Sequence, residues 1–315
     1  MIDKRVFLLR DSLLFEIRSF FREEGFIEVD TPFVVPYENP DDNVENVRVF
    51  FSDFKGDSYT FFLHTSPEFF MKRLVWYGLE KIFQIARVFR NGEIGDAHNL
   101  EFTMVEWYRV RGDYTCGMDE TERMVKRCFS RAKAFGFKTD VDLTGNFLKV
   151  TVDEAFREFA GVRDVMDEEE VKKVAGRGTY EDAFFFLLVD RIEPTLSQIK
   201  KPLFLYDFPE KFSAMAKVKD KKAERFELYI KGIEVANGYT ELTDFQSYLK
   251  KFELKGERAV DIGFLKLLKD KPLPDCEGVA LGFDRLLMAI TGGKIADVIP
   301  FTTDELIREV KDWKG

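Results

Sequence analysis

The stretch FQIARVFRNGEIGDAHNLEFTMVEWY, residues 83–108, constrains the fold more than any other part of the chain. Residues 83–90 alternate between apolar and polar positions in the way of a half-buried strand, and residues 102–108 alternate again. The residues between them, 91–100, contain glycines and polar residues that are typical of a loop. The stretch therefore predicts an antiparallel hairpin with a long loop.

The polar side chains of this hairpin suit a ligand better than a protein core. Arginine and glutamate among aromatic residues are costly to bury unless a ligand or a partner faces them. Arg90, His98 and Phe102 offer a planar donor, an imidazole and a stackable ring, a combination that favours a nucleotide. An edge hairpin covered with surface ion pairs is the alternative that this stretch leaves open.

Composition excludes several classes of protein. With 315 residues, 45% of them hydrophobic, and 34 Phe, the chain can bury a large core. A net charge of −9 without a basic stripe argues against a protein whose main function is to bind nucleic acid. We interpret the lysine cluster Lys217–Lys222 as a solvated surface. Three cysteines without C-x-x-C spacing argue against a disulfide scaffold or a zinc site. With no apolar run of about 20 residues and no signal peptide, we expect a soluble cytoplasmic protein without membrane contact.

The rest of the chain predicts further helices and strands around the hairpin. These are a helix over 6–24, a strand over 26–30 that ends at Thr31-Pro32, strands over 47–54 and 59–64, a helix after Thr65-Ser66-Pro67-Glu68, a helix over 115–135, shorter helices within 140–200 and a strand over 202–206. Glu68 taken alone is explained by its place in the first turn of a helix.

A second stretch with chemistry is RFELYIKGIEVANGYTEL, residues 225–242. Lys231-Gly232 predicts a two-residue turn between two strands, in a register where Tyr229 faces Glu234 and Glu227 faces Ala236. Glu227 and Glu234 are then diagonal neighbours, and two such carboxylates suit Mg²⁺. A lysine paired with Glu227 on an exposed sheet is the alternative. Asn237-Gly238 predicts a bulge that turns Tyr239 and Glu241 toward the same pocket.

A third stretch, residues 278–285, is a small-residue strand that runs into an apolar helix. Small residues let a ligand approach the backbone, and Arg285 would lie near a helix amino terminus, where phosphate binds well.

Together these stretches resemble a known family. FRNGE followed by HNLEFTMVEWY resembles motif 2 of the class II aminoacyl-tRNA synthetases, most of all the lysyl branch and its short paralogue, the elongation factor P–lysine ligases. The helix, strand and proline of residues 6–32 are similar to motif 1, and residues 278–285 are similar to motif 3. The resemblance covers nearly the whole chain. It implies an α+β class II catalytic domain, an antiparallel sheet flanked by helices, with residues 1–315 as a single domain, a helical insertion at about 140–200, and a homodimer. About 25 residues precede the first strand, so we expect no anticodon-binding domain.

The resemblance also implies a role for individual residues. Arg90 and Arg285 would act on the phosphates of ATP in catalysis, and Glu227 and Glu234 would bind Mg²⁺. The expected ATP contacts are Arg90, Glu93, His98, Asn99, Phe102 and Arg285. The expected amino-acid pocket is Ser66, Glu68, Glu106, Tyr108, Asn237, Tyr239, Glu241 and Ala280. Three positions depart from the synthetase pattern: Gly92 stands where motif 2 has a glutamate, Leu100 where it has a proline, and Ala280 where motif 3 has a glycine, a change shared with the short paralogue. We expect Glu93 to replace the missing glutamate.

The activity implied by the resemblance is ATP-dependent activation of lysine or β-lysine as an adenylate, followed by transfer to a lysine side chain of elongation factor P. Transfer RNA is not the expected acceptor. Two alternatives stay open: a truncated lysyl-tRNA synthetase-like enzyme acting on tRNA or a small amine, and a regulator that binds amino acid without catalysis.

Overall fold

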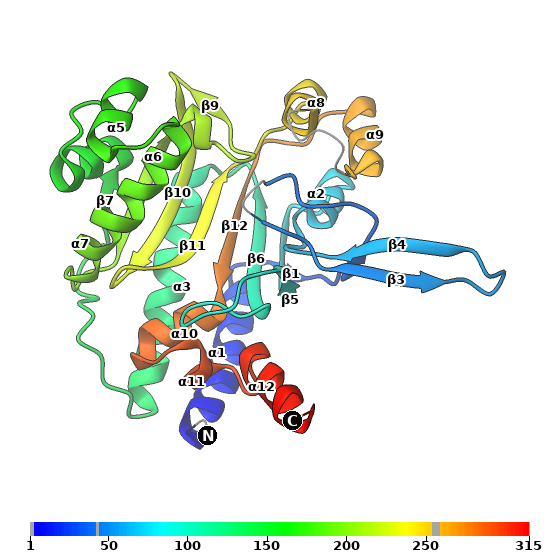
Figure 1. The fold of residues 1–315 in the computed structure, drawn as a ribbon, viewed down its shortest axis with the longest axis horizontal. Coiled ribbons are helices and arrows are strands. Elements are labelled where there is room, and N and C mark those ends of the chain that lie inside the picture. The colour runs from blue at the N-terminus through cyan, green and yellow to red at the C-terminus, as the bar shows by residue number, and fades with distance from the viewer. Residues whose placement is uncertain (1–2, 42–43, 254–258, 315) are drawn as a thin grey trace.

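The computed structural model describes residues 3–41, 44–253 and 259–314. A mixed sheet forms the centre of the molecule, in the order β1-β5-β6-β12-β11-β10-β8-β7, with β9 paired to β10 (Figure 1). Its strands are β1 (Ile27–Glu28), β5 (Lys81–Phe89), β6 (Glu101–Val110), β7 (Leu148–Thr151), β8 (Leu203–Pro209), β9 (Val218–Lys219), β10 (Lys222–Ile230), β11 (Ile233–Thr240) and β12 (Cys276–Gly282). The expected hairpin is the pair β5–β6, at the register Phe83 to Trp107.

The sheet is antiparallel except at its two edges, where β1–β5 and β7–β8 are parallel. Parallel neighbours need a crossover connection between them. The helical segment expected at about 140–200 supplies the crossover from β7 to β8. The expected strand over 26–30 is limited to β1 because only two of its residues pair with β5.

A smaller sheet in the order β2-β4-β3 extends from the body (Figure 1). It consists of β2 (Val34–Val35), β3 (Arg48–Ser52) and β4 (Ser58–Leu63), so the strand pair expected at 47–64 is confirmed. Phe50 and Phe54 are exposed on this arm, at 74% and 112%.

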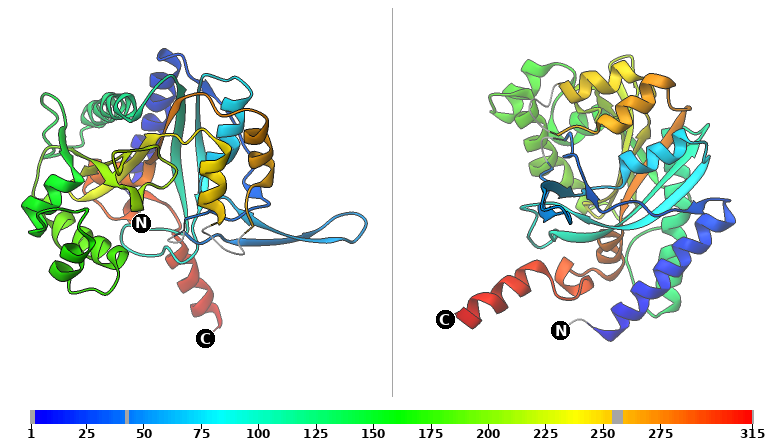
Figure 2. Two further views of the ribbon diagram at one scale, coloured as in Figure 1. Left: turned by 90° about the horizontal axis from the view of Figure 1, so that it is seen from above. Right: turned by 90° about the vertical axis from the view of Figure 1, so that its right-hand side faces the viewer.

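Helices cover both faces of the central sheet (Figure 2). They are α1 (Lys4–Glu23), α2 (Glu68–Trp76), α3 (Tyr114–Ala134), α4 (Val152–Ala155), α5 (Glu168–Ala175), α6 (Tyr180–Leu187), α7 (Glu193–Ser197), α8 (Phe245–Glu253), α9 (Ile262–Asp270), α10 (Phe283–Thr291), α11 (Ile295–Val298) and α12 (Thr303–Lys314). Two π-helical turns, η1 (Phe156–Ala160) and η2 (Leu188–Ile192), and a 3₁₀ turn, η3 (Glu210–Phe212), complete the set. Within the described residues, no helix has the length and apolar character that crossing a membrane requires.

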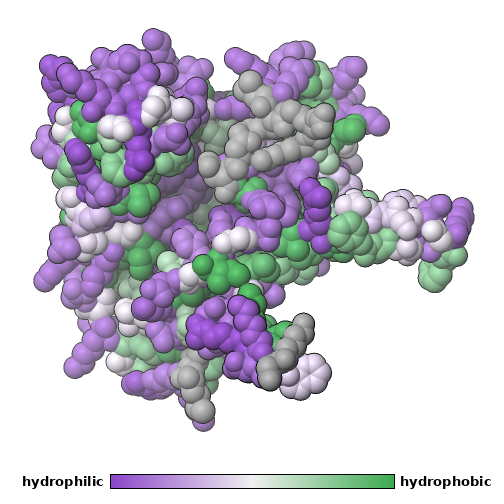
Figure 3. Space-filling model, in the orientation of Figure 1, coloured by the Kyte–Doolittle hydropathy of each residue, from purple (hydrophilic) through white to green (hydrophobic). Residues whose placement is uncertain are grey.

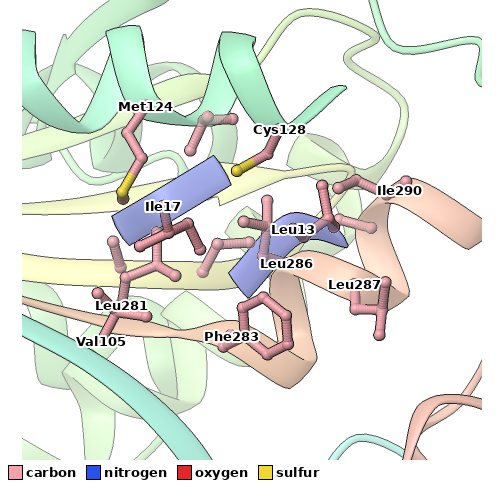
Figure 4. Close-up of a cluster of buried hydrophobic side chains, with 14 of the residues drawn as sticks. Leu13, Ile17, Val105, Met124, Cys128, Leu281, Phe283, Leu286, Leu287 and Ile290 are labelled. Atoms are coloured by element: carbon pink, nitrogen blue, oxygen red, sulfur yellow. The ribbon is translucent and has the colours of Figure 1, made fainter. Parts of the chain in front are cut away.

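The back of the sheet packs on α1, α3 and α10 to form the main core. Asp3 caps α1 by accepting a hydrogen bond from the backbone N–H of Arg5, and Gly25, at φ +82°, follows its end. Leu13 and Ile17 of α1 meet Val105 and Leu281 of the sheet, together with residues of α3 and α10 (Figure 4). Burying each such side chain contributes about 1.5–3 kcal/mol to the free energy of unfolding. The back face is therefore committed to the core, and the front face is free to carry a site.

Two further apolar clusters frame the front face. One lies in the lobe of α4 to α7 and includes Phe156 and Phe184, whose rings stack at 4.7 Å. The other packs α2, α8 and α9 over the opposite half of the sheet, where Tyr248 and Phe264 are fully buried. The front face between these two groups of helices is open.

Candidate active site

Strand pairing brings the expected pocket residues into two rows on the front of the sheet. Residues directly opposite each other on neighbouring strands share a face. One row, read from β10 to β6, is Glu227, Asn237, Ala280 and Glu106, and the next is Arg225, Tyr239, Gly278 and Tyr108. The sheet therefore aligns residues that are up to 174 positions apart in the chain, because Ala280 and Glu106 are neighbours in one row.

These rows form the floor of a cavity of about 1930 Å³. The same face of the molecule is hollowed between the α5–α6 lobe and the rest of the body, with largely hydrophilic walls (Figure 3). The expected site residues that line it are Ser66, Glu68, Arg90, Glu106, Tyr108, Glu227, Glu234, Asn237, Tyr239, Glu241 and Ala280.

One end of the cavity is strongly acidic. Glu106 accepts hydrogen bonds from the hydroxyls of Ser66, at 2.6 Å, and Tyr108, at 2.7 Å. Burial and the nearby Glu68 raise the pKa of Glu106 to about 7. Burial likewise raises the pKa of Glu241 to about 8, against the opposing effect of Lys72. Three carboxylates buried this close together favour a cationic ligand.

Lys72 lies directly behind this end of the cavity, and the sequence analysis did not single it out. It lies on α2, its side chain is fully buried, and its Nζ is 2.5 Å from Glu68 and 2.6 Å from Glu241. One signal was available in the sequence: a lysine stands four residues after Glu68, on the same face of the helix, in the run FFMKRLVW.

Gly278 is required by the close approach of two pocket side chains. A Cβ at this position would lie 2.3 Å from Oε1 of Glu241 and 2.5 Å from the ring of Tyr108. Both distances are far below van der Waals contact, so only glycine fits between them.

The expected register of β10 and β11 is partly wrong. Lys231 and Gly232 form the turn, both at positive φ, and Tyr229 faces Glu234 as expected. Glu227, however, faces Asn237, not Ala236, because the bulge lies between Leu228 and Tyr229.

The bulge expected at Asn237-Gly238 is therefore absent, since both residues pair regularly with β10. Gly238 serves packing instead: a Cβ there would lie 2.7 Å from the ring of Phe226 and 2.8 Å from Val279.

Glu227 and Glu234 lie on the same face and suit a magnesium ion shared with phosphate. Arg225 and the hydroxyl of Tyr229 donate to the two oxygens of Glu227, at 2.6 and 2.8 Å, so an arginine stands where a lysine was the alternative. Burial raises the pKa of Glu227 to about 7, Arg225 opposes the rise, and Glu234 adds to it. In the described part of the chain, no three acidic, histidine or cysteine side chains form a cluster that could hold a metal. A pair of carboxylates completed by phosphate and water is the arrangement that Mg²⁺ prefers.

The residues expected at the nucleotide converge beside this pair. The guanidinium of Arg90 lies over the Phe102 ring, 5.2 Å from its centroid, and 3.7 Å from the carboxylate of Glu93. Arg285 is 2.7 Å from Nε2 of His98 and 3.2 Å from Glu234. Burial and Arg285 lower the pKa of His98, which keeps its imidazole neutral near pH 7.

Asn99 differs from the other expected ATP contacts. Its amide donates to the carbonyl of Glu101 at 2.7 Å, and its side-chain oxygen accepts from the N–H of Thr303 at 2.9 Å. The side chain is buried and ties the motif 2 loop to the start of α12. Any part that Asn99 plays toward ATP would come from holding this loop in position.

The fold and this site define the class of protein. The family model described as tRNA synthetases class II (D, K and N) matches residues 3–305, and the chain belongs to this family. The chain is thus an ATP-dependent ligase of the class II synthetase type.

Two groups of relatives cover the chain almost completely. It is 37% identical, over 90% of its length and 94% of the relative, to a protein of Aquifex aeolicus (strain VF5) named elongation factor P–(R)-β-lysine ligase homolog. It is 35% identical, over 93% of its length and 94% of each relative, to proteins of Yersinia pestis (strain Pestoides F) and Yersinia pseudotuberculosis serotype O:1b (strain IP 31758) named elongation factor P–(R)-β-lysine ligase.

Proposed function

We propose that this protein uses ATP to activate lysine or β-lysine as an adenylate and transfers the aminoacyl group to a lysine side chain of elongation factor P. The observation that carries the proposal is the acidic end of the cavity, where Glu68, Glu106 and Glu241 gather among tyrosines. Buried carboxylates need cations close by. Lys72 supplies one cation to these three carboxylates. An amino acid with two ammonium groups supplies the other two, whereas a neutral or acidic amino acid supplies only one.

In the first step, a carboxylate oxygen of the amino acid attacks the α-phosphorus of ATP, the bond to the β-phosphate oxygen breaks, and pyrophosphate leaves. Arg90 would stabilise the charge on the α-phosphate, and Phe102 would stack on adenine once Arg90 has turned from its ring toward the phosphate. His98 and Arg285 would contact the outer phosphates. Positioning and electrostatics suffice for this chemistry, so no protein nucleophile is required.

Glu227 and Glu234 are the residues that would hold Mg²⁺. The ion, when bound, neutralises charge on the phosphates. Arg225 and Tyr229 hold the Glu227 carboxylate in one orientation, and Arg285 does the same for Glu234. The chain's own contribution is therefore to fix the direction of both carboxylates before ATP arrives.

In the second step, the ε-amine of the acceptor lysine attacks the carbonyl carbon of the adenylate, AMP leaves, an amide bond forms, and the amine loses its extra proton to water. The names of the relatives support elongation factor P as the acceptor. The net charge of −9 also disfavours a polyanion such as tRNA. Ala280, which stands between Asn237 and Glu106 in the row, is the residue shared with the short paralogue at this position.

The test supplies the enzyme with ATP, labelled lysine or β-lysine, and either elongation factor P or tRNA. We expect elongation factor P to gain the mass of one lysyl residue, and elongation factor P with its target lysine replaced by arginine is the matched control. Acylated tRNA beside unmodified elongation factor P would favour the truncated-synthetase alternative. Pyrophosphate–ATP exchange supported equally well by aspartate or asparagine would refute the choice of lysine.

We also propose that residues 1–315 act as one catalytic domain, that two copies form a homodimer, and that the protein works in the cytoplasm. Exposed apolar side chains support the dimer: Phe15 of α1 is 65% exposed and Ile27 of β1 is 56% exposed. Hydrophobic residues also lie along the base of the β3–β4 arm (Figure 3). The cytoplasm is where a translation elongation factor meets the ribosome.

A further inference from the structure

Lys72 lies behind the acidic end of the cavity, in contact with two of its carboxylates, and the activity proposed above leaves it without a role. Its side chain points back along α2 toward Glu68, as residues four apart on a helix do. The same nitrogen reaches Glu241, which follows β11 and is far away in the chain. One ammonium group therefore joins two carboxylates of the expected amino-acid pocket, Glu68 and Glu241.

The surroundings of Lys72 keep its ammonium charged. Burial lowers the pKa of Lys72, but Glu241 and Glu68 more than offset this and hold it well above 10.5. The rings of Phe69, Tyr239 and Tyr248 surround the nitrogen, with centroids 5.4–5.8 Å away.

The contacts leave one oxygen of each carboxylate for a ligand. Lys72 contacts Oε1 of Glu68 and Oε2 of Glu241. Oε1 of Glu68 also accepts from the Tyr239 hydroxyl, at 3.1 Å. Among the described residues, neither Oε2 of Glu68 nor Oε1 of Glu241 has a hydrogen-bond donor in contact. Oε1 of Glu241 packs against Gly278, in the place that a Cβ would otherwise take.

The charges of these carboxylates and of Lys72 indicate which kind of ligand the pocket can bind. A bound cation favours the ionised form of the carboxylates that it contacts. With Glu68, Glu106 and Glu241 ionised in this bound state and Lys72 protonated, the pocket carries a charge of −2. Two ammonium groups of a ligand match that charge, while the ligand carboxylate faces Arg90. Without Lys72, the repulsion between Glu68 and Glu241 would be unopposed, which would raise the pKa of Glu241 further or turn one of the two carboxylates away.

We propose that Lys72 is a positioning residue that holds Glu68 and Glu241 in the orientation and charge state needed to bind a substrate with two ammonium groups. This inference rests on the proposed function and deepens it: the substrate class is a diamino acid, and the spacing of its two ammonium groups is set by the pair that Lys72 joins. Lys72 itself need not touch the reacting atoms.

The first experiment measures lysine-dependent pyrophosphate–ATP exchange in Lys72→Met, which keeps the approximate shape of the side chain and removes its charge. We expect the KM for lysine to rise about 10- to 100-fold, as for the loss of a charged hydrogen-bond partner, with the KM for ATP unchanged. Lys81→Met is the matched control, because Lys81 donates only to the Glu24 carbonyl, outside the cavity. An unchanged KM for lysine in Lys72→Met overturns the inference.

The second experiment uses chemical rescue, which separates positioning from simple packing. Lys72→Ala leaves a space that propylammonium fills with the missing three carbons and nitrogen. We expect propylammonium to lower the KM for lysine at least tenfold in this variant, and 1-propanol, which fills the space without charge, to have no effect. Equal rescue by both, or rescue by neither in a variant that unfolds at the wild-type temperature, overturns the inference.

The wild-type protein distinguishes this inference from the function on which it rests. Wild-type exchange that does not depend on lysine or β-lysine would refute the proposed function and the inference together. Lysine-dependent wild-type exchange with normal kinetics in Lys72→Met would refute the inference alone.

Discussion

Glu277 is predicted to make the stability of this protein fall as the pH rises. It lies on β12 on the face opposite the cavity, is fully buried, and has a hydrogen bond to neither carboxylate oxygen among the described residues. Its neighbour Glu120 already forms an ion pair with Arg109 and accepts from the indole N–H of Trp107 at 3.0 Å. Burial, and then Glu120, raise the pKa of Glu277 well above 4.5, while Arg109 opposes them and Cys116 adds a small increase.

The sign follows from the direction of this shift. A carboxyl group whose pKa is higher in the folded than in the unfolded protein favours folding most at a pH below its unfolded pKa of about 4.5. That contribution is lost as the pH rises toward the folded pKa, because the unfolded state gives up the proton first. Glu277→Gln removes the titration and leaves an amide that can donate to Glu120. We expect the free energy of unfolding at pH 8 to rise by about 1–3 kcal/mol, the cost of a buried polar group without a partner, with a smaller gain at pH 5.

The assay is urea unfolding followed by tryptophan fluorescence, from pH 5 to pH 8.5, in the wild type and Glu277→Gln. Glu80→Gln is the control, because the Glu80 side chain is 65% exposed and its pair with Arg111 lies on the surface. The control should follow the wild type at every pH. Two results would contradict this reasoning. One is a Glu277→Gln protein that is no more stable than the wild type at pH 8. The other is a difference in stability that is the same at pH 5 and pH 8.

Four further predictions concern the amino-acid pocket and the ATP contacts. Glu241→Gln should weaken the use of lysine by about 1–3 kcal/mol in pyrophosphate exchange. Because the pKa of Glu241 is about 8 in the empty pocket, the wild-type KM for lysine should also fall between pH 6.5 and pH 8.5; a flat profile would contradict this. Glu93→Ala should raise the KM for ATP, since the Glu93 carboxylate lies 3.7 Å from Arg90 beside the unusual Gly92; an unchanged KM would mark Glu93 as a solvated loop residue. Gly278→Ala should abolish the use of lysine while binding of a fluorescent ATP analogue persists, because the added methyl would strike Glu241 and Tyr108; a normal KM for lysine would refute the steric argument.

Much of the fold was predictable because its signals are local. The ends of α1 and α3 follow from Asp3, Gly25 and Asp113, which cap or end helices by contacts within a few residues. The hairpin β5–β6 follows from alternation and from the composition of its loop. The parallel edges of the sheet could not be predicted in this way, because a parallel pair such as β7–β8 joins segments separated by an entire lobe of helices.

The residues of the candidate site differ in the same way: local motifs predict some of them, and only the tertiary structure shows what the others contact. Motif residues such as Arg90, Phe102 and Arg285 were found because each motif is continuous in the chain and resembles a family pattern. The family pattern also predicted Asn99 as an ATP contact. Its side chain instead accepts a hydrogen bond from the N–H of Thr303, a contact between distant segments that no local motif encodes.

The sequence by itself determined which residues carry charge, where the central strands and the helices α1 and α3 lie, and which family the three motifs resemble. Only the tertiary structure decided the partners of those charges. Glu227 faces Asn237 because a bulge falls between Leu228 and Tyr229. Lys72 joins Glu68 to Glu241 because the fold brings α2 next to the residue that follows β11. The physical reason is that helix ends and alternation depend on neighbours in the chain, whereas register and buried ion pairs depend on packing between distant segments.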